Sequence, residues 1–294
     1  MRVVVLGTAA GGGVPQWNCA CRHCSAVRRG VAPSRRQDCV AISADGEGWF
    51  LLNASPDLRE QLVSCTSFSP GPLPRQTPLR GVLLTDGELD HTLGLFHLKE
   101  AEGLHVWAPG AVRDTVAARE VVANYRRWEW RRARESFEVG GLVVTTVAIS
   151  DKRPKYAAES TLDGPWVVAY HLADPATGGT LVYAPCLAEW PSGFSKLCSE
   201  ASCVLLDGSF YAPDEMHGST AGQVDSAAQT AMGHLPMAGA SGSLAMIRQT
   251  DGSARWLFTH LNNTNPVLDP GSAEYAAVLA AGAEIPFDGA ELVL

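Results

Sequence analysis

The chain has 294 residues, of which 46% are hydrophobic and 18% charged, as in proteins with a sizeable buried core. Its formal net charge of −8 argues against binding along a nucleic-acid backbone. The sequence contains no apolar run of about 18 residues, the length that a membrane span needs. It opens directly on Met1-Arg2-Val3-Val4-Val5-Leu6-Gly7, without the long apolar segment of a signal peptide. We therefore expect a cytoplasmic protein with no membrane span and no nucleic-acid partner.

Short runs rich in Val, Leu and aromatic residues, each bounded by Gly, Pro, Asp or Asn, predict β-strands. In chain order they are Arg2–Leu6, Trp49–Asn53, Gly81–Leu84, His105–Ala108, Leu142–Val147, Trp166–His171, Leu181–Tyr183, Cys203–Leu206 and Arg255–Phe258. Apolar periodicity predicts helices over Asp57–Val63, Leu93–Ala101, Ala111–Trp130 and Ser272–Ala281. Strands that alternate irregularly with helices indicate a layered α/β protein. Because no compositional break marks a linker, we expect one domain over residues 1–294.

A basic cluster overlaps the end of the third predicted helix, where arginines are interleaved with Trp128 and Trp130. The arginines are Arg126, Arg127, Arg131, Arg132 and Arg134. We interpret the cluster as a solvent-exposed helix face. The alternative is that it lines the pocket of an acidic substrate.

Cys19, Cys21 and Cys24 bring three thiols together just after the turn Gly11-Gly12-Gly13. Three thiolates this close can converge on one tetrahedral ion, and soft sulfur ligands favour Zn²⁺. Since no open coordination position is evident, we expect a structural zinc in a loop near residues 17–26. The motif leaves the fourth ligand unsettled unless His23 turns inward. The alternative is three uncoordinated thiols. The other scattered cysteines are expected to be small buried hydrophobes: Cys39, Cys65, Cys198 and Cys203.

An acidic loop with a histidine follows the predicted strand Gly81–Leu84. It contains four side chains that can bind a metal: Asp86, Glu88, Asp90 and His91. Turns between a strand and a helix are where α/β proteins place their sites. On the pattern alone, an acidic loop in which Asp90 caps the next helix is supported equally well.

The spacing of this loop resembles the His-x-His-x-Asp-His signature of the metallo-β-lactamase superfamily, with Asp86 and Glu88 standing where two histidines normally stand. Four further segments resemble superfamily elements in the same order: residues 6–15, 53–59, 258–261 and 287–289. Narrower combinations resemble the coenzyme PQQ synthesis protein B family over nearly the whole chain. They are Trp17-Asn18-Cys19-Ala20-Cys21, Asp86-x-x-x-Asp90-His91-Thr92, Met232-Gly233-His234-Leu235 and His260-Leu261-Asn262-Asn263-Thr264-Asn265-Pro266. This resemblance implies an α/β fold, the metallo-β-lactamase-type αββα four-layer sandwich.

The resemblance also implies a reduced metal site. Two-metal hydrolases of the superfamily bind the first metal through the paired histidines and a third histidine, but the downstream loop at residues 150–156 contains none. The bridging aspartate is replaced by Ala184-Pro185-Cys186, and we do not assign Cys186 as a ligand. The second-metal ligands survive as Asp90, His91 and His260. Two histidines and one carboxylate are typical of non-haem Fe(II) oxygenases, although zinc could use the same ligands. We predict a single active-site Fe(II), with O₂ as co-substrate.

Further roles follow from the same resemblance. His234 lies where related nucleases carry an active-site histidine, and we predict that it donates or accepts a proton; the alternative is a core histidine. Asp207 either supports a metal-binding histidine or is a residue of a strand-end turn. Asp86 is expected to hold a ligand or a substrate hydroxyl, Arg59 to bind an acidic substrate, and Glu88 to face water.

The family resemblance implies a role in the biosynthesis of pyrroloquinoline quinone (PQQ), which derives from a fused glutamate and tyrosine. We expect an iron-dependent oxygenase that hydroxylates the tyrosine ring of a small, acidic, Glu-Tyr-derived precursor. The alternatives are a non-catalytic carrier that helps transport PQQ or its precursor to the periplasm, and a phosphodiesterase- or lactonase-type metallohydrolase. Other PQQ-pathway proteins and a second copy in a homodimer are the expected protein partners.

Overall fold

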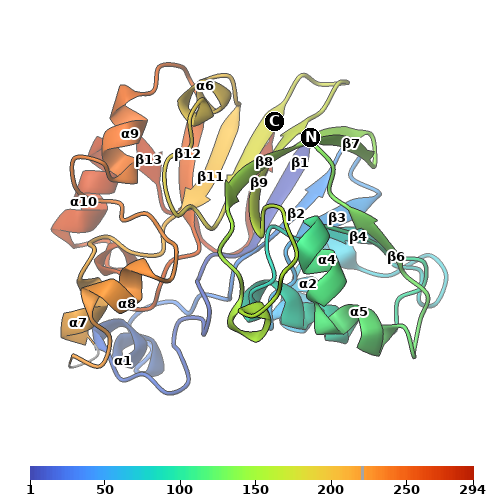
Figure 1. The fold of residues 1–294 in the computed structure, drawn as a ribbon, viewed down its shortest axis with the longest axis horizontal. Helices are drawn as coiled ribbons and strands as arrows, with labels where there is room; N and C mark the ends of the chain where they lie inside the picture. Colours follow the sequence, from blue (N-terminus) through green and yellow to red (C-terminus); the bar gives the residue numbers. More distant parts are fainter. Residues whose placement is uncertain (220–221) are drawn as a thin grey trace. The chain divides into compact units, whose positions relative to one another are not determined.

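The structure is a computed structural model that describes residues 1–219 and 222–294 (Figure 1). Contacts among these residues define two compact units, each built from separate stretches of the chain. Unit 1 consists of Met1–Gly7, Asp38–Thr180 and Asp288–Leu294, and unit 2 of Thr8–Gln37 and Leu181–Phe287. The expected single domain over residues 1–294 stays a prediction. Among the described residues, no helix is both long enough and apolar enough to cross a membrane.

Unit 1 contains a seven-stranded mixed sheet with the strand order β14-β1-β2-β3-β4-β5-β6. From β14 to β3 the neighbours are antiparallel, and from β3 to β6 they are parallel. The strands are β1 (Arg2–Gly7), β2 (Cys39–Ser43), β3 (Trp49–Leu52), β4 (Leu79–Leu83), β5 (His105–Ala108), β6 (Glu129–Arg132) and β14 (Ala290–Val293). Every residue of β2 and β3 is buried, which is why these central strands are almost continuously apolar.

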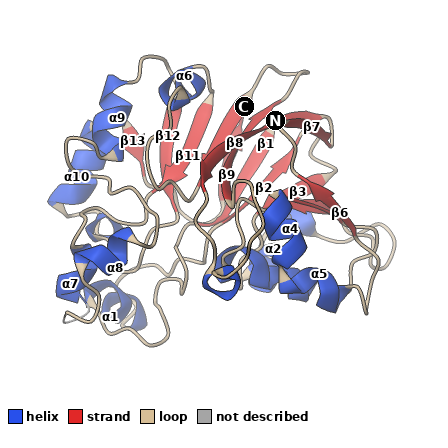
Figure 2. Ribbon diagram, in the orientation of Figure 1, coloured by secondary structure: helices blue, strands red, loops and turns tan. Residues whose placement is uncertain are grey.

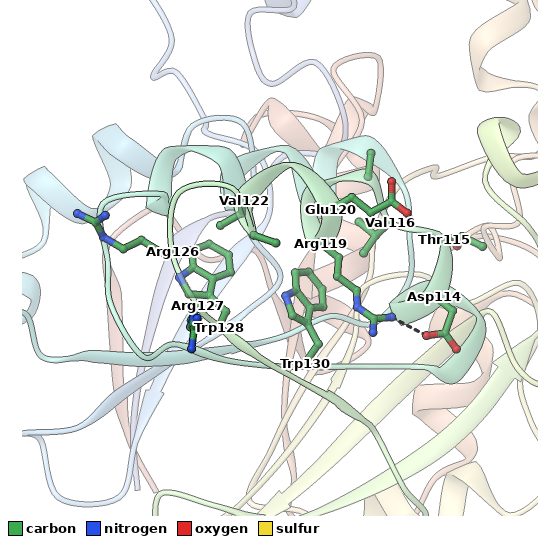
Figure 3. A pocket seen from close by; sticks show the side chains of 12 residues that line it. Asp114, Thr115, Val116, Arg119, Glu120, Val122, Arg126, Arg127, Trp128 and Trp130 are labelled. Atoms are coloured by element: carbon green, nitrogen blue, oxygen red, sulfur yellow. Dashed lines mark hydrogen bonds and ion pairs between the residues drawn. The ribbon is translucent and has the colours of Figure 1, made fainter.

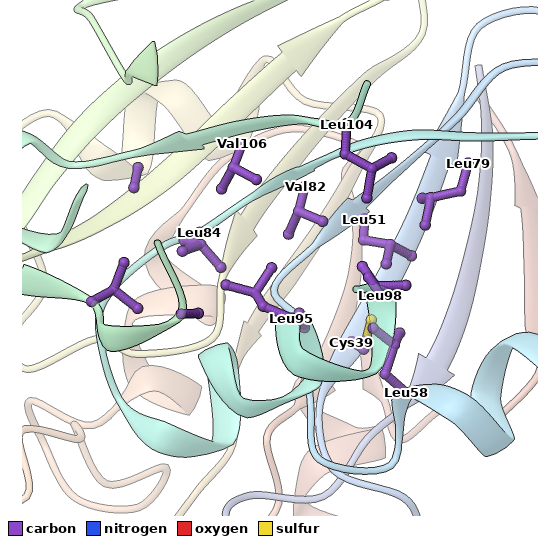
Figure 4. Close-up of a cluster of buried hydrophobic side chains, with 14 of the residues drawn as sticks. Cys39, Leu51, Leu58, Leu79, Val82, Leu84, Leu95, Leu98, Leu104 and Val106 are labelled. Atoms are coloured by element: carbon purple, nitrogen blue, oxygen red, sulfur yellow. The ribbon is translucent and has the colours of Figure 1, made fainter. Parts of the chain in front are cut away.

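Short helices cover this sheet and enclose the hydrophobic core of unit 1 (Figures 2 and 4). Leu51 and Val82 from the sheet pack with Leu58 of α2 and with Leu95 and Leu98 of η2. The helical segments of the unit are α2 (Leu58–Ser64), η1 (Thr66–Phe68), α3 (Leu89–Thr92), η2 (Leu93–Leu98), α4 (Gly110–Thr115), α5 (Ala117–Val122) and η3 (Lys155–Ala157). The antiparallel strands β7 (Ser136–Val139), β8 (Leu142–Ser150) and β9 (Val167–Ala173) also belong to this unit.

Unit 2 is built on four parallel strands in the order β13-β12-β11-β10. They are β10 (Thr180–Ala184), β11 (Cys203–Asp207), β12 (Arg255–Thr259) and β13 (Ala283–Glu284). Its helical segments are α1 (Arg22–Arg28), α6 (Phe194–Ser199), α7 (Glu215–Ser219), α8 (Ser226–Thr230), α9 (Ser243–Gln249), η4 (Pro266–Leu268) and α10 (Ala273–Ala280). The carboxyl ends of β11 and β12 lie side by side, since Asp207 is in register with Thr259.

All nine predicted strands are confirmed to within a few residues at their ends. The helices predicted at 57–63 and 272–281 are confirmed as α2 and α10, and the one at 93–101 is a shorter 3₁₀ segment, η2. The cysteines Cys39, Cys198 and Cys203 are buried as expected, whereas Cys65 is only half-buried.

The helix predicted over Ala111–Trp130 is wrong in its second half. Helical structure breaks at Val116, whose backbone is extended, and ends at Val122, and the chain then returns as strand β6. Trp128 and Trp130, two residues apart, pack together against the core of unit 1 (Figure 3). The basic cluster therefore borders the edge of a sheet, and its interpretation as a helix face is wrong.

Candidate metal-binding histidines and their supports

In unit 1 the acidic loop leaves β4 and brings Asp86 against His91. Asp86 is 2% exposed, and its Oδ2 lies 2.7 Å from Nδ1 of His91. The same carboxylate accepts hydrogen bonds from the hydroxyl of Thr85 at 2.8 Å and from the backbone N–H of Glu88 at 2.9 Å. Thr85 is itself held by the side chain of Asn53, in a segment matched by the superfamily resemblance. Asp86 therefore fixes the ring of His91 and leaves Nε2 as the nitrogen that would bind a metal.

Electrostatics make Asp86 and His91 a charged pair. Burial acts to raise the pKa of Asp86, but the charge and hydrogen bond of His91 outweigh it and lower this pKa. Burial acts to lower the pKa of His91, but Asp86 and then Asp90 outweigh it and raise this pKa. A metal that binds Nε2 must displace a proton from this imidazolium, so metal affinity is expected to fall at low pH.

The other two acidic residues of the loop differ from Asp86. Asp90 lies inside the first turn of α3, a half-buried position, so the alternative in which it caps a helix is wrong. Glu88 is also half-buried and forms an ion pair with Lys152 at 2.7 Å, rather than simply facing water. Arg59, predicted to bind substrate, lies exposed on α2 with its guanidinium 3.5 Å from the carboxylate of Glu60.

In unit 2 a second network joins the ends of β11 and β12. Oδ2 of Asp207 lies 2.7 Å from Nδ1 of His234 and accepts a hydrogen bond from the backbone N–H of Leu187. Oδ1 of Asp207 accepts hydrogen bonds from the backbone N–H and the hydroxyl of Ser209. Oγ of Ser209 lies 2.7 Å from Nδ1 of His260 and 3.0 Å from Nδ1 of His234. Asp207 thus contacts His234 directly and reaches His260 through a hydroxyl.

The backbone of His260 has a φ of +56°, in the left-handed region. For a residue with a Cβ this conformation costs on the order of 1 kcal/mol. Backbone hydrogen bonds hold it on both sides, from Gly208 N–H to Thr259 O and from Leu261 N–H to Thr8 O. The turn stacks the His260 ring on that of His234, with centroids 5.0 Å apart and planes inclined by 23°.

Two residues near His260 were not assigned from the sequence. Ser209 was missed: it lies two residues after Asp207 at a strand end, but serine is common in turns, so this position is only a weak signal. Cys186 is buried, and its Sγ lies within 4.8 Å of a ring nitrogen of His260. Asp207, His234 and His260 also bring one potential ligand atom each within 4.8 Å of one another. His234 therefore has the surroundings of either an acid-base residue or a ligand.

The cysteine cluster in unit 2 is compact. The three Sγ atoms of Cys19, Cys21 and Cys24 lie within 4.8 Å of one another. Cys21 caps the N-terminus of α1 through its sulfur, and Nδ2 of Asn263 lies 3.1–3.5 Å from all three sulfurs. Burial raises the pKa of Cys24 to about 12. Half-buried His23 is not part of the cluster of ligand atoms. Three converging sulfurs suit Zn²⁺, which would ionise the thiols on binding.

His91, His234 and His260 share a feature of metal-binding histidines: one ring nitrogen is held by a neighbouring side chain. Nδ1 of His91, His234 and His260 is engaged by Asp86, Asp207 and Ser209, respectively. Metal-binding histidines almost always have one ring nitrogen held in this way, since this fixes the tautomer and the orientation of the other nitrogen.

Comparison with known proteins shows the superfamily to which the fold belongs. A family model described as a β-lactamase superfamily domain matches residues 48–261. The solved structure of Zn(2+)-bound PqqB from Methylobacterium extorquens is 35% identical, with a TM-score of 0.91 and 100% of both chains covered. The predicted α/β fold of the metallo-β-lactamase type is therefore confirmed. A diphosphatase of the PhnP family, 18% identical with a TM-score of 0.71, shares the fold.

Curated relatives define the particular family. The coenzyme PQQ synthesis protein B of Azotobacter vinelandii is 36% identical over 308 residues, with 100% of both chains covered. The protein of the same name from Nitrosococcus oceani is 36% identical over 319 residues, again with 100% of both covered. The chain belongs to the coenzyme PQQ synthesis protein B family, as the resemblance in its motifs implied.

Proposed function

We propose that the chain acts in PQQ biosynthesis as a metal-dependent oxygenase, with one Fe(II) bound by Asp90, His91 and His260. Membership of the family supports the pathway, and the ligand set of two histidines and one carboxylate supports the chemistry. The observation that carries the proposal is the support of Nδ1 in both histidines, by Asp86 and by Ser209. When bound, Fe(II) would supply the redox chemistry for O₂ and leave coordination positions open for O₂ and substrate.

The proposed substrate is a small, acidic, Glu-Tyr-derived molecule. Hydroxylation puts one oxygen atom of O₂ into a ring C–H bond. The other leaves as water, which takes two electrons and two protons from a reductant. Nδ1 of His234 faces Asp207, so Nε2 is the atom that would exchange a proton with the phenol. Asp86 is proposed to orient His91, because its carboxylate oxygens are engaged by the loop and by that ring.

Anaerobic reconstitution followed by an assay tests this function. The protein is loaded with Fe(II) or Zn²⁺, then given a Glu-Tyr dipeptide, ascorbate as reductant, and O₂. We expect O₂ uptake and a product heavier by one oxygen atom with Fe(II) only, both lost in His91→Ala and His260→Ala. Stoichiometric PQQ binding without turnover would instead favour the carrier. Metal-dependent cleavage of a phosphodiester, with two metals per chain, would favour the hydrolase.

We also propose that Cys19, Cys21 and Cys24 bind one structural zinc, for which their converging sulfurs are the support. Structural zinc can contribute on the order of 10 kcal/mol to folding. Cys21→Ser should lose one zinc per chain and melt at a lower temperature, whereas the matched Cys65→Ser should keep its zinc. Equal zinc content in both variants would remove this proposal.

A further inference from the structure

A groove of about 860 Å³ lies between α5 and the start of β6 in unit 1 (Figure 3). Trp128 and Trp130 line it side by side, with ring centroids 6.4 Å apart and planes inclined by 30°. The indole N–H of Trp128 donates a hydrogen bond to the backbone carbonyl of Ala101, which fixes that ring. The groove therefore has an aromatic floor, formed by the residue before β6 and by the second residue of β6.

Strand β6 is the last in the order of its sheet, and no strand of the described residues pairs with its outer edge. On the inner side, the backbone N–H groups of Glu129 and Ala133 donate to carbonyls beside β5. Successive residues of a strand direct their backbone groups to opposite sides. The N–H and C=O groups of Trp130 and Arg132 therefore point to the outer edge, where an added strand would find them.

Arginine side chains outnumber carboxylate side chains in the lining of the groove. Arg119 forms an ion pair with Asp114 at 2.7 Å inside the groove (Figure 3). Arg126 lies 3.6 Å from the strongly exposed Glu102, a contact that solvent weakens. Arg127 is exposed and has no ion pair among the described residues. The lining contains three arginines and two carboxylates, Asp114 and Glu120, so the groove has a small local excess of positive charge on a chain whose net charge is −8.

We propose that the groove binds an extended acidic segment of a partner protein, which adds as a parallel or antiparallel strand to the outer edge of β6. Main-chain hydrogen bonds to Trp130 and Arg132 would give affinity, as in other cases of strand addition. Alternate side chains of the segment would lie over Trp128 and Trp130, and its carboxylates would meet Arg126 and Arg127. Charged edge strands can also exist only to prevent aggregation, and the test must separate that role from docking.

The probe is a synthetic seven-residue peptide, blocked at both ends, with two glutamates at one end to meet Arg126 and Arg127 and alternating valine and threonine in the remaining five residues. Three matched peptides serve as controls: one with lysine for glutamate, and two N-methylated at alternate amides, one in each register. We expect saturable one-to-one binding of the glutamate peptide by calorimetry. The N-methylated peptide of one register should bind at least about tenfold more weakly, since each lost main-chain bond costs several-fold. The lysine peptide should not bind.

Protein variants complete the test. Arg127→Glu, at an exposed position, should weaken the glutamate peptide at least about tenfold. The matched Arg248→Glu, on α9 of unit 2, should leave binding unchanged. Hydrogen exchange should slow at the amides of Trp130 and Arg132 when the peptide is bound. Equal binding of both N-methylated peptides, equal binding of the lysine peptide, no change in exchange, or no binding would each overturn the proposal. Protection of the same amides by self-association without peptide would also overturn it, in favour of a second copy.

Discussion

Two pairs of a buried carboxylate and a histidine, one in each unit, have the same local geometry. In unit 1, Oδ2 of Asp86 lies 2.7 Å from Nδ1 of His91, and in unit 2, Oδ2 of Asp207 lies 2.7 Å from Nδ1 of His234. Each carboxylate ends or follows a strand and accepts backbone N–H bonds. In both, burial acts to raise the pKa of the carboxyl, and the facing histidine outweighs it and lowers that pKa.

The surroundings of the two pairs differ. Asp86 supports one histidine, whereas Asp207 supports His234 directly and His260 through the hydroxyl of Ser209. A carboxylate on Nδ1 raises the basicity of Nε2, which serves a metal ligand and an acid-base residue equally well. The geometry of a pair therefore does not by itself distinguish the two roles. Metal content and turnover distinguish the two roles. A substitution in the pair of unit 1 should mainly lower iron binding, whereas one in the pair of unit 2 should mainly slow turnover.

The largest expected effect is on turnover in His234→Ala. If His234 exchanges a proton with the substrate, kcat should fall about 10²-fold or more while the iron content stays near one per chain. Metal analysis and O₂ uptake measure both quantities on one preparation. The control is His97→Ala, which changes an exposed histidine of η2. Loss of iron in His234→Ala would make His234 a ligand and the two pairs equivalent.

A somewhat smaller effect is expected for Asp86→Asn, which keeps the shape of the side chain but removes its charge. Loss of a group that orients a metal-binding histidine typically costs about 10–100-fold in metal affinity. Competition with a chelator of known affinity measures this. Asp207→Asn is the matched variant in unit 2, and it should slow turnover while changing iron affinity less. If both variants lose iron equally, the proposed division between the pairs is wrong.

Ser209→Ala tests the indirect support of His260. The hydroxyl is neutral, and charge-assisted hydrogen bonds are roughly twice as strong as neutral ones. We therefore expect a loss of about fivefold in iron affinity, less than in Asp86→Asn. Ser43→Ala removes another buried hydroxyl, one bonded to Gly48 O in unit 1, and controls for loss of stability. Unchanged iron affinity in Ser209→Ala would mean that the strained turn alone orients His260.

These supports mark the limit of what the sequence could predict. The strand at Cys203–Asp207 and the histidine at the end of β12 were predictable, because strands carry apolar runs and ligand types are few. Ser209 was not, because serine is common in turns and its partner His260 is far away in the chain. Asp86 was expected to hold a ligand or a substrate hydroxyl, but its contact with Nδ1 of His91 depends on the path of the loop between them, which spacing does not define.

The segment before β6 shows a different limit. Ala111–Val122 has helix-forming composition, and the periodicity continues far enough to suggest one helix to Trp130. The alternation of Trp128 and Trp130 was a strand signal, but it became decisive only through packing against the core beside β5. Local preference was overridden there by tertiary contacts, which one sequence does not display.

The last expected effect is on folding stability and not on metal binding, and it concerns a third carboxylate, Glu215. It accepts hydrogen bonds from the hydroxyl of Thr264 and the backbone N–H of Tyr211, and burial raises its pKa to about 7. An unfolded glutamic acid has a pKa near 4.3. Glu215 therefore favours the folded state fully below that pH, and this contribution is lost as the pH rises through about 7. For Asp86 and Asp207, whose pKa values are lowered, the sign is opposite, and their contribution is lost in acid.

Between pH 4.5 and 7.5, the ionisation of Glu215 should lower the unfolding free energy of the unmodified protein by about 1–2 kcal/mol, a modest amount because the side chain is partly exposed. In Glu215→Gln this decrease should be absent. Urea unfolding of both proteins across this range measures it. Subtracting the two curves cancels the titration of the histidines, which both proteins share. Glu159→Gln, at an exposed position, should follow the unmodified protein. The difference is the unfolding free energy of the unmodified protein minus that of Glu215→Gln. If it were flat or rose with pH, Glu215 would be ionised in the folded state, as Asp86 and Asp207 are.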